Sequence, residues 1–111
     1  MIDIGTVLRE SRDASKTVRS LTGFRSSECA LLVALNPDHA MPMSQLADQI
    51  GLSPAGTTRL VGRLEARGGW VSRKQYKGDA RVVLARLTEA GRGEAIRVVR
   101  LLETKMDWRG Y

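Results

Sequence analysis

The chain has 111 residues, of which 42% are hydrophobic and 27% are charged, and its formal net charge is +6. This length predicts a single domain over residues 1–111 with one modest core. No apolar run approaches the roughly 18 residues of a membrane-spanning helix, and the N-terminus lacks a signal-peptide pattern, so we expect no membrane span and a cytoplasmic location. A single cysteine excludes an internal disulfide, which agrees with a reducing compartment.

The positive charge is concentrated in the second half of the chain. Residues 1–58 hold five Arg or Lys against six Asp or Glu, whereas residues 59–100 hold eleven against four. Residues 101–111 are balanced. A localised basic excess is typical of proteins that bind a polyanion such as nucleic acid, and an inert basic surface is the alternative.

The first predicted helix covers residues 5–21, in the sequence GTVLRESRDASKTVRSL. Its apolar residues recur at spacings of seven, four and three, close to a heptad seam: Val7, Ala14, Val18 and Leu21. Such a stripe packs either onto the core of its own domain or onto a second subunit. The spacing leaves both possibilities open.

The next predicted helix begins at Ser26 or Ser27, ends at Leu35, and is apolar around most of its circumference, so we expect it in the core. Cys29 within it is expected to behave as a small buried hydrophobe, with oxidation sensing as the alternative. A turn at residues 36–38 ends this helix, since proline cannot continue it. The only histidine, His39, has no partner at metal-ligand spacing, so we expect neither a metal site nor an acid–base role.

Residues 44–68 predict two helices joined by a tight turn. Ser44 is expected to cap the first helix and Gly51 to form the turn. Ser53 is expected to cap the second helix, with Pro54 in its first position. Residues at helical spacing form the buried stripe of this second helix: Thr57, Leu60, Val61 and Leu64. The basic outer face favours a helix-turn-helix that binds DNA, and the alternative is a helical hairpin in a core.

The periodicity then changes from helical to extended. Residues 70–74 and 82–87 predict two strands, and the polar, basic stretch at residues 75–81 predicts the loop between them. A β-hairpin directly after a recognition helix is the wing of a winged helix-turn-helix. The Met41-Pro42-Met43 stretch predicts a short extended segment before the first helix of the pair, with the methionines used for packing.

Thr88 predicts the N-cap of a final helix, in which Gly91 and Gly93 would weaken the first turns, so that the regular part begins near Glu94. Its predicted apolar stripe contains four residues: Ile96, Val99, Leu102 and Met106.

These motifs, in this order, resemble the MarR family of winged-helix transcription regulators over about residues 26–95. The matching stretches are Gln45-Leu46-Ala47, Gly51-Leu52-Ser53, Thr58-Arg59-Leu60-Val61, Arg63-Leu64-Glu65, Asp79-x-Arg81 and Leu87-Thr88-Glu89-Ala90-Gly91. Three departures are one extra residue at Gly68-Gly69, Pro54-Ala55-Gly56 in place of the larger polar residues common at the start of the recognition helix, and a single helix after Thr88, where the family has two.

The resemblance implies a mainly α fold with a small β-hairpin (α+β), in which a winged helix-turn-helix is flanked by N- and C-terminal helices. The DNA-binding core would span residues 26–93, with the helix-turn-helix at 44–68 and the wing at 70–87. The flanking helices, at about residues 5–25 and 94–111, would form a dimerisation region. The implied function is regulation of transcription by a homodimer on a palindromic or pseudopalindromic DNA operator, with release by a small phenolic or lipophilic effector or by cysteine oxidation.

The predicted DNA-binding residues lie on the second helix of the pair and on the wing. Arg59 and Arg63 are expected to read guanine in the major groove, although Arg59 has an alternative role in a salt bridge that orients the wing. By the resemblance, Arg81 would enter the minor groove, with Asp79 orienting it. The complete predicted set is Ser53, Ala55, Thr57, Thr58, Arg59, Arg63, Arg73, Lys74, Lys77, Asp79 and Arg81.

Two classes of function remain open. The first is the sequence-specific DNA-binding regulator just described. The second is a winged-helix module or antagonist that binds a protein, which the small, apolar start of the second helix would suit. One histidine, one cysteine and no paired carboxylates provide no catalytic constellation, so we expect neither an enzyme nor a cofactor.

Overall fold

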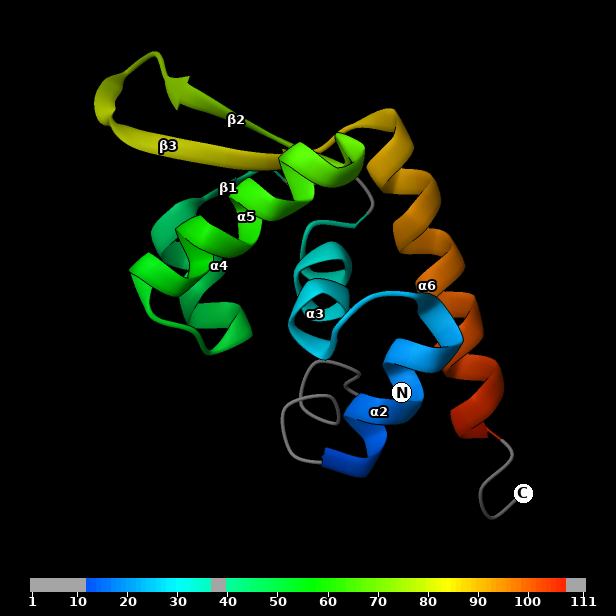
Figure 1. The fold of residues 1–111 in the computed structure, drawn as a ribbon. Coiled ribbons are helices and arrows are strands. Elements are labelled where there is room, and N and C mark those ends of the chain that lie inside the picture. Colours follow the sequence, from blue (N-terminus) through cyan, green and yellow to red (C-terminus); the bar gives the residue numbers. More distant parts are fainter. Residues whose placement is uncertain (1–11, 37–39, 108–111) are drawn as a thin grey trace.

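The structure is a computed structural model that describes residues 12–36 and 40–107, with side chains described for residues 16–36 and 40–104. These residues form five helices and a small antiparallel sheet, in an α+β arrangement (Figure 1). The elements in chain order are α2 (Arg12–Thr22), α3 (Ser26–Ala34), β1 (Met41–Pro42), α4 (Met43–Ile50), α5 (Pro54–Gly68), β2 (Val71–Tyr76), β3 (Asp79–Leu87) and α6 (Glu89–Asp107). Among the described residues, no helix has the length and apolar character needed to cross a bilayer.

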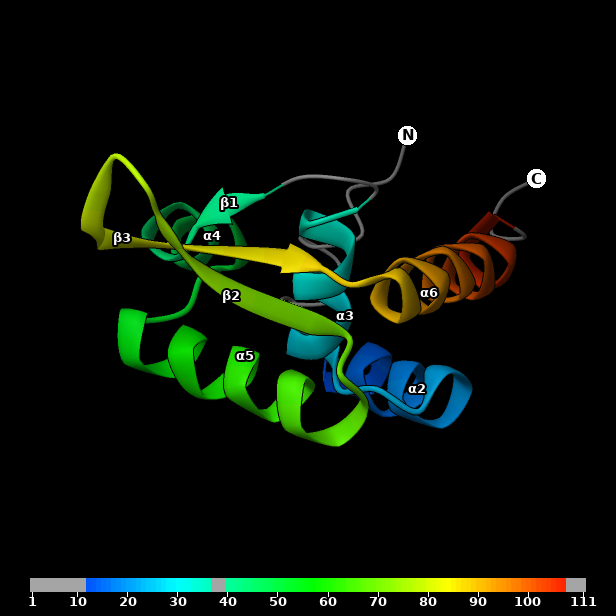
Figure 2. The same cartoon turned by 90° about the horizontal axis from the view of Figure 1, so that it is seen from above.

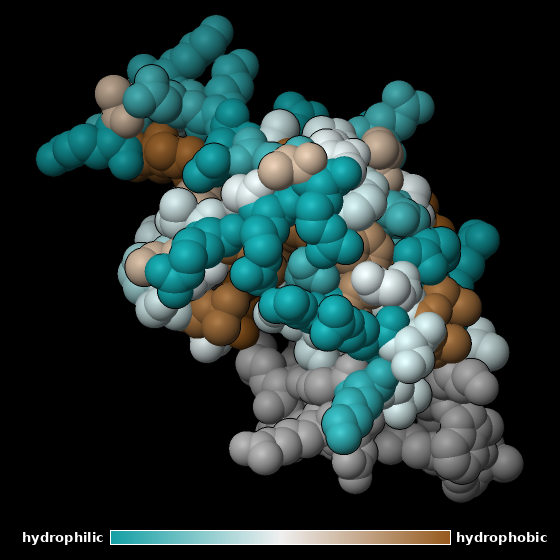
Figure 3. All heavy atoms as spheres, in the orientation of Figure 1, coloured by the Kyte–Doolittle hydropathy of each residue, from teal (hydrophilic) through white to brown (hydrophobic). Residues whose placement is uncertain are grey.

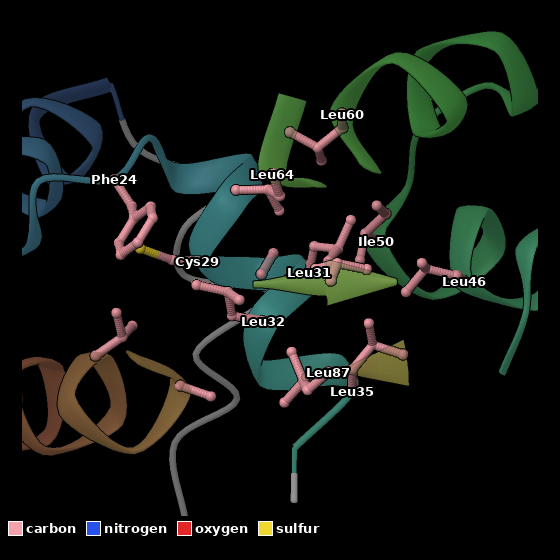
Figure 4. Close-up of a cluster of buried hydrophobic side chains, with 14 of the residues drawn as sticks. Phe24, Cys29, Leu31, Leu32, Leu35, Leu46, Ile50, Leu60, Leu64 and Leu87 are labelled. Carbon is pink, nitrogen blue, oxygen red and sulfur yellow. The ribbon is translucent and has the colours of Figure 1, made fainter. Parts of the chain in front are cut away.

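Helix α3 occupies the centre of the molecule, with α4 and α5 on one side and α2 and α6 on the other (Figure 1). Its leucines are fully buried, as the apolar sequence of this helix predicted. Figure 4 shows side chains from α4, α5 and β3 converging on them. The leucine and isoleucine side chains of this core include Leu31, Leu32, Leu35, Leu46, Ile50, Leu60, Leu64 and Leu87. The burial of these side chains supplies the main driving force that holds the helix pair against the rest of the fold.

The sheet has the strand order β1-β3-β2, and its long β2–β3 hairpin projects beyond the helices as a wing (Figures 1 and 2). The predicted extended segment is β1, which pairs with β3 through Met41 and Ala85. The hairpin strands are longer than predicted, because most of the polar stretch 75–81 belongs to them. A register shift beside Gln75 absorbs the extra residues of β3, and cross-strand backbone hydrogen bonds here override the loop-like composition.

The turn of the helix-turn-helix forms as the sequence predicted. Gly51 has φ +75° and ends α4 in the left-handed conformation. The Ser53 hydroxyl accepts the Gly56 N–H at 3.0 Å and so caps α5, which begins at Pro54. The predicted cap of α4 is wrong: the N-cap is Pro42 rather than Ser44, because β1 leads the chain directly into the helix.

Helix α6 begins at Glu89 rather than near Glu94. The Thr88 hydroxyl accepts the Gly91 N–H at 3.1 Å and donates to the Gly69 carbonyl at 2.6 Å, which joins the start of α6 to the end of α5. A Cβ at Gly91 would overlap the Trp70 carbonyl oxygen. This glycine therefore allows close packing between α6 and the base of the wing, instead of weakening the helix.

The predicted apolar stripe of α6 is confirmed at Leu102 and wrong at Ile96, while Val99 is half-buried. The buried residues are Ala95, Val98 and Leu102, whereas Ile96 is 43% exposed. The predicted and the observed stripe both have helical spacing. Packing of α6 against α3 and α2 decides that the stripe with Ala95, Val98 and Leu102 is the buried one. The side chain of Met106, together with residues 5–11 of the first predicted helix and His39, lies outside the described residues.

Candidate nucleic-acid interface

The buried stripe of α5 determines which side of this helix faces the core. The side chains of Leu60, Val61 and Leu64 lie in the core, as predicted. Thr57 is also fully buried, at 0% exposure, and its hydroxyl donates to the Ser53 carbonyl at 2.9 Å. The prediction of Thr57 as a DNA-binding residue is therefore wrong, because its position on the core side of the helix removes it from any external surface.

The opposite side of α5 carries the other predicted residues of this helix. Arg59 and Arg63 are exposed, and neither has a hydrogen bond or ion pair with a described residue. Thr58 is also exposed and donates its hydroxyl hydrogen bond back to the Pro54 carbonyl at 3.0 Å. Ser53 and Ala55 complete this exposed set at the N-terminal end. The guanidinium groups of Arg59 and Arg63 are thus available to an external partner.

A different arginine makes the salt bridge between the recognition helix and the wing. Arg73 of β2 lies 2.7 Å from the carboxylate of Glu65 on α5, and both side chains are partly exposed. The alternative prediction for Arg59, an ion pair that orients the wing, is not observed with any residue that the structure describes. The wing is therefore fixed to α5 through its own strand, which leaves Arg59 unengaged.

The wing presents a pre-oriented arginine. Both side-chain nitrogens of Arg81 that face Asp79 lie 3.2 Å from its carboxylate oxygens, and the Arg81 backbone N–H donates to the same group at 3.0 Å. These hydrogen bonds lower the pKa of Asp79 below its ordinary value, so the carboxylate stays charged. Arg81 is nevertheless 90% exposed. Asp79 thus orients Arg81, as predicted, and Lys74 and Lys77 are exposed on the same hairpin.

A groove of about 520 Å³ separates the wing from the helix pair. Its polar lining comes from Ser44, Thr58, Arg73 and Arg81. Its apolar lining comes from the β1–α4 junction and from β3. The complete lining is Pro42, Met43, Ser44, Thr58, Arg73, Arg81, Val82 and Val83.

A buried carboxylate at the far end of α5 was not predicted. Glu28 is 1% exposed and lies 2.9 Å from the guanidinium of Arg67, while its second oxygen accepts the Arg25 N–H at 2.8 Å. Arg67 also lies over the Trp70 ring, with its guanidinium carbon 5.6 Å from the centroid. In the sequence, the signal for this buried carboxylate is an acidic residue in the first turn of an otherwise apolar helix. This ion pair ties the recognition helix to α3.

Cys29 is fully buried beside Glu28, as the sequence predicted. Burial raises the pKa of its thiol to about 11, and its sulfur lies 3.5 Å from the Thr22 hydroxyl. A thiol in this environment is protonated and shielded at neutral pH. In the part of the chain that the structure describes, no group of three or more His, Cys, Asp or Glu side chains is arranged to hold a metal ion.

Together, α4, α5 and the β2–β3 hairpin define a winged helix-turn-helix. Figure 3 shows hydrophilic side chains spread over α5 and the wing on one face of the molecule. The family model of the MarR family matches residues 25–83, more than half of the chain. The chain belongs to the MarR family.

Known proteins agree with this assignment. The uncharacterized HTH-type transcriptional regulator YdgJ of Bacillus subtilis is 35% identical over 71 residues, which are 64% of this chain and 43% of YdgJ. The chain thus spans less than half the length of this curated relative. A mutant of MarR from E. coli, solved in complex with operator DNA, has a TM-score of 0.77 and 18% identity, covering 96% of this chain and 78% of its own. NadR, solved in complex with 4-hydroxyphenylacetate, has a TM-score of 0.77 and 20% identity, covering 97% and 79%. These two similarities concern the fold.

Proposed function

We propose that this protein is a sequence-specific DNA-binding regulator that inserts α5 into the major groove. The observation that carries this proposal is the pair of exposed arginines on α5, Arg59 and Arg63, which no described residue engages. A guanidinium group donates two hydrogen bonds to the N7 and O6 atoms of guanine, which makes arginine the commonest reader of that base. Exposed Thr58 would contact a base edge or a phosphate, and Ala55 the methyl group of a thymine.

The wing would bind the adjacent minor groove through Arg81. Because Asp79 already restrains this side chain, less conformational entropy is lost when the arginine enters a narrow A·T tract. Arg73, Lys74 and Lys77 would neutralise backbone phosphates beside it. Arg73 would contact a phosphate from the side of the wing that faces α5, where its ion pair with Glu65 holds the guanidinium.

We further propose that the protein acts as a homodimer on a palindromic or pseudopalindromic operator in the cytoplasm. Helix α6 carries an exposed Ile96 and, about one turn further along, a half-buried Val99. Apolar residues that the core of one copy leaves exposed are suited to pack against a second copy. Two copies related by a two-fold axis would present two α5 helices to two half-sites.

A small aromatic acid is the class of effector that the groove beside the wing would accept. The cations of Arg73 and Arg81 would pair with a carboxylate, while Pro42 and Val82 offer apolar surface to a ring. NadR was solved with a compound of this class. A ligand in the groove would occupy the space between Thr58 and Arg81, and would thereby compete with DNA for both.

Selection from a random-sequence duplex library tests the proposed function. The parent protein is expected to enrich a motif that contains guanine, Arg63→Ala to relax that preference, and Arg81→Ala to weaken binding to duplexes with A·T-rich flanks. Lys16→Ala, an exposed change on α2 that lies outside α5, the wing and the apolar residues of α6, serves as the matched control and is expected to select the parent motif. Enrichment of no motif by a folded parent would contradict the proposal and favour the alternative, a winged-helix module that binds a protein.

A further inference from the structure

A second basic site lies at the C-terminal end of α5. This end of the helix lies away from the tip of the wing (Figures 1 and 2). The site is a crevice of about 290 Å³ between α5, the end of α2 and the turn that leads into α3. We call it the arginine crevice. Its lining is Arg19, Gly23, Arg25, Glu28, Arg63 and Arg67.

The charges of the arginine crevice are not balanced internally. Both oxygens of Glu28 are engaged, one by the Arg67 guanidinium and the other by the backbone N–H of Arg25. The side chains of Arg19, Arg25 and Arg63 have no hydrogen bond or ion pair within the described part of the chain. Among the residues that the structure describes, three guanidinium groups therefore line one opening without a carboxylate to compensate them. A cluster of exposed cations of this kind raises the local concentration of anions.

The arginine crevice continues the exposed face of α5. Arg59, Arg63 and Arg67 are spaced four residues apart and so follow one side of the helix. Arg63 belongs both to this row and to the lining of the crevice. In Figure 3, the hydrophilic side chains extend over α5 toward the part of the molecule that contains α2. A partner that lies along α5 would therefore reach the crevice without a break in the positive surface.

We propose that the arginine crevice binds phosphate groups of the DNA backbone that flank the bases contacted by α5, on the side opposite the wing. This inference rests on the proposed function. Guanidinium groups bind phosphate oxygens through paired hydrogen bonds, and the side chains of Arg19, Arg25 and Arg63 are exposed to such a partner. A duplex that touches the wing, α5 and the crevice would contact the protein along the whole length of the recognition helix.

The salt dependence of binding tests this proposal. Each phosphate contact contributes a slope of about −0.9 to the plot of log K against log salt concentration. With a mixed-sequence duplex of about 30 base pairs as the probe, Arg19→Ala and Arg25→Ala are each expected to flatten the slope by about that amount and to leave the selected motif unchanged. Arg25→Lys is expected to keep the parent slope, and Lys16→Ala, which removes an exposed cation of α2 that does not line the crevice, serves as the control.

Folding of the variants is checked by their thermal unfolding curves. The side chains of Arg19 and Arg25 are exposed. The contact of Arg25 with Glu28 uses the backbone N–H, which alanine retains. A parent that binds duplexes with the same slope as the Arg19→Ala/Arg25→Ala double variant would overturn this inference and leave the proposed function intact. Inorganic phosphate could instead stabilise the parent but not the double variant, while the two proteins have equal slopes on DNA. That result would make the crevice a small-anion site and would also overturn this inference. A parent that binds no duplex would overturn both proposals.

Discussion

Replacing Arg67 by alanine would leave the buried carboxylate of Glu28 without the cation beside it. The two groups lie 2.9 Å apart, and the carboxylate is 1% exposed while Arg67 is 48% exposed. Removing one partner of a fully buried pair costs about 3–5 kcal/mol. Water reaches the outer half of Arg67 and screens the interaction, so we expect a smaller loss, about 1–3 kcal/mol in the free energy of unfolding. Part of this loss is the cation–π contact with Trp70.

A double-mutant cycle separates the ion pair from that second contact. Urea unfolding of Glu28→Gln, Arg67→Ala and the double variant is expected to give a coupling energy of about 1–2 kcal/mol. The same cycle on Glu65 and Arg73, a pair with both members partly exposed, is the matched control and is expected to give at most about 1 kcal/mol. A coupling energy below about 0.5 kcal/mol would contradict a stabilising ion pair between Glu28 and Arg67, since additive changes imply independent side chains.

Three further predictions concern packing, pH and thiol reactivity. Gly91→Ala is expected to lower the free energy of unfolding by about 1–3 kcal/mol, because its Cβ meets the Trp70 backbone, whereas Gly93→Ala has open space and is expected to raise it by about 0.5–1 kcal/mol. Thermal unfolding distinguishes the two, and equal effects would contradict the proposed close packing at Gly91. The pKa of Asp79 is expected to lie below its ordinary 3.8, so the stabilising contact with Arg81 is present at neutral pH and is lost as the pH falls through the lowered value. An NMR titration measures this pKa, and Arg81→Ala is expected to return it toward 3.8. Cys29, whose pKa is about 11, is expected to react with a thiol reagent at about pH 7.5 only after unfolding in urea. Rapid reaction in the folded protein would show that the thiol is accessible.

Local signals made the helix-turn-helix predictable from sequence. The left-handed turn needs Gly51, the cap needs the Ser53 hydroxyl, and Pro54 fits only the first position of a helix. The buried stripe of α5 also followed from spacing alone. The N-cap of α4 could not be predicted from spacing, because strand β1 determines where that helix begins. The pairing of β1 with β3 is a long-range contact.

Other features depended on contacts that no local pattern contains. Two apolar stripes of α6 have equally good helical spacing, and the packing of α3 and α2 decides that Ala95 is buried while Ile96 is exposed. The length of the wing depends on cross-strand pairing rather than on composition. Within the candidate site, the orientation of Arg81 by Asp79 was predictable from their closeness in the sequence. The pairing of Glu28 with Arg67 was not, because 39 residues separate them.

Footprinting on a duplex selected by the protein tests whether α5 and the wing are the elements that bind DNA. We expect two protected segments in the major groove, about 10 base pairs apart from centre to centre, each flanked by protection in the minor groove. Arg81→Ala is expected to remove the minor-groove protection alone, and Arg59→Ala/Arg63→Ala to remove the protection in the major groove. Uniform protection that none of these substitutions alters would contradict the assignment of α5 and the wing as the DNA-binding elements.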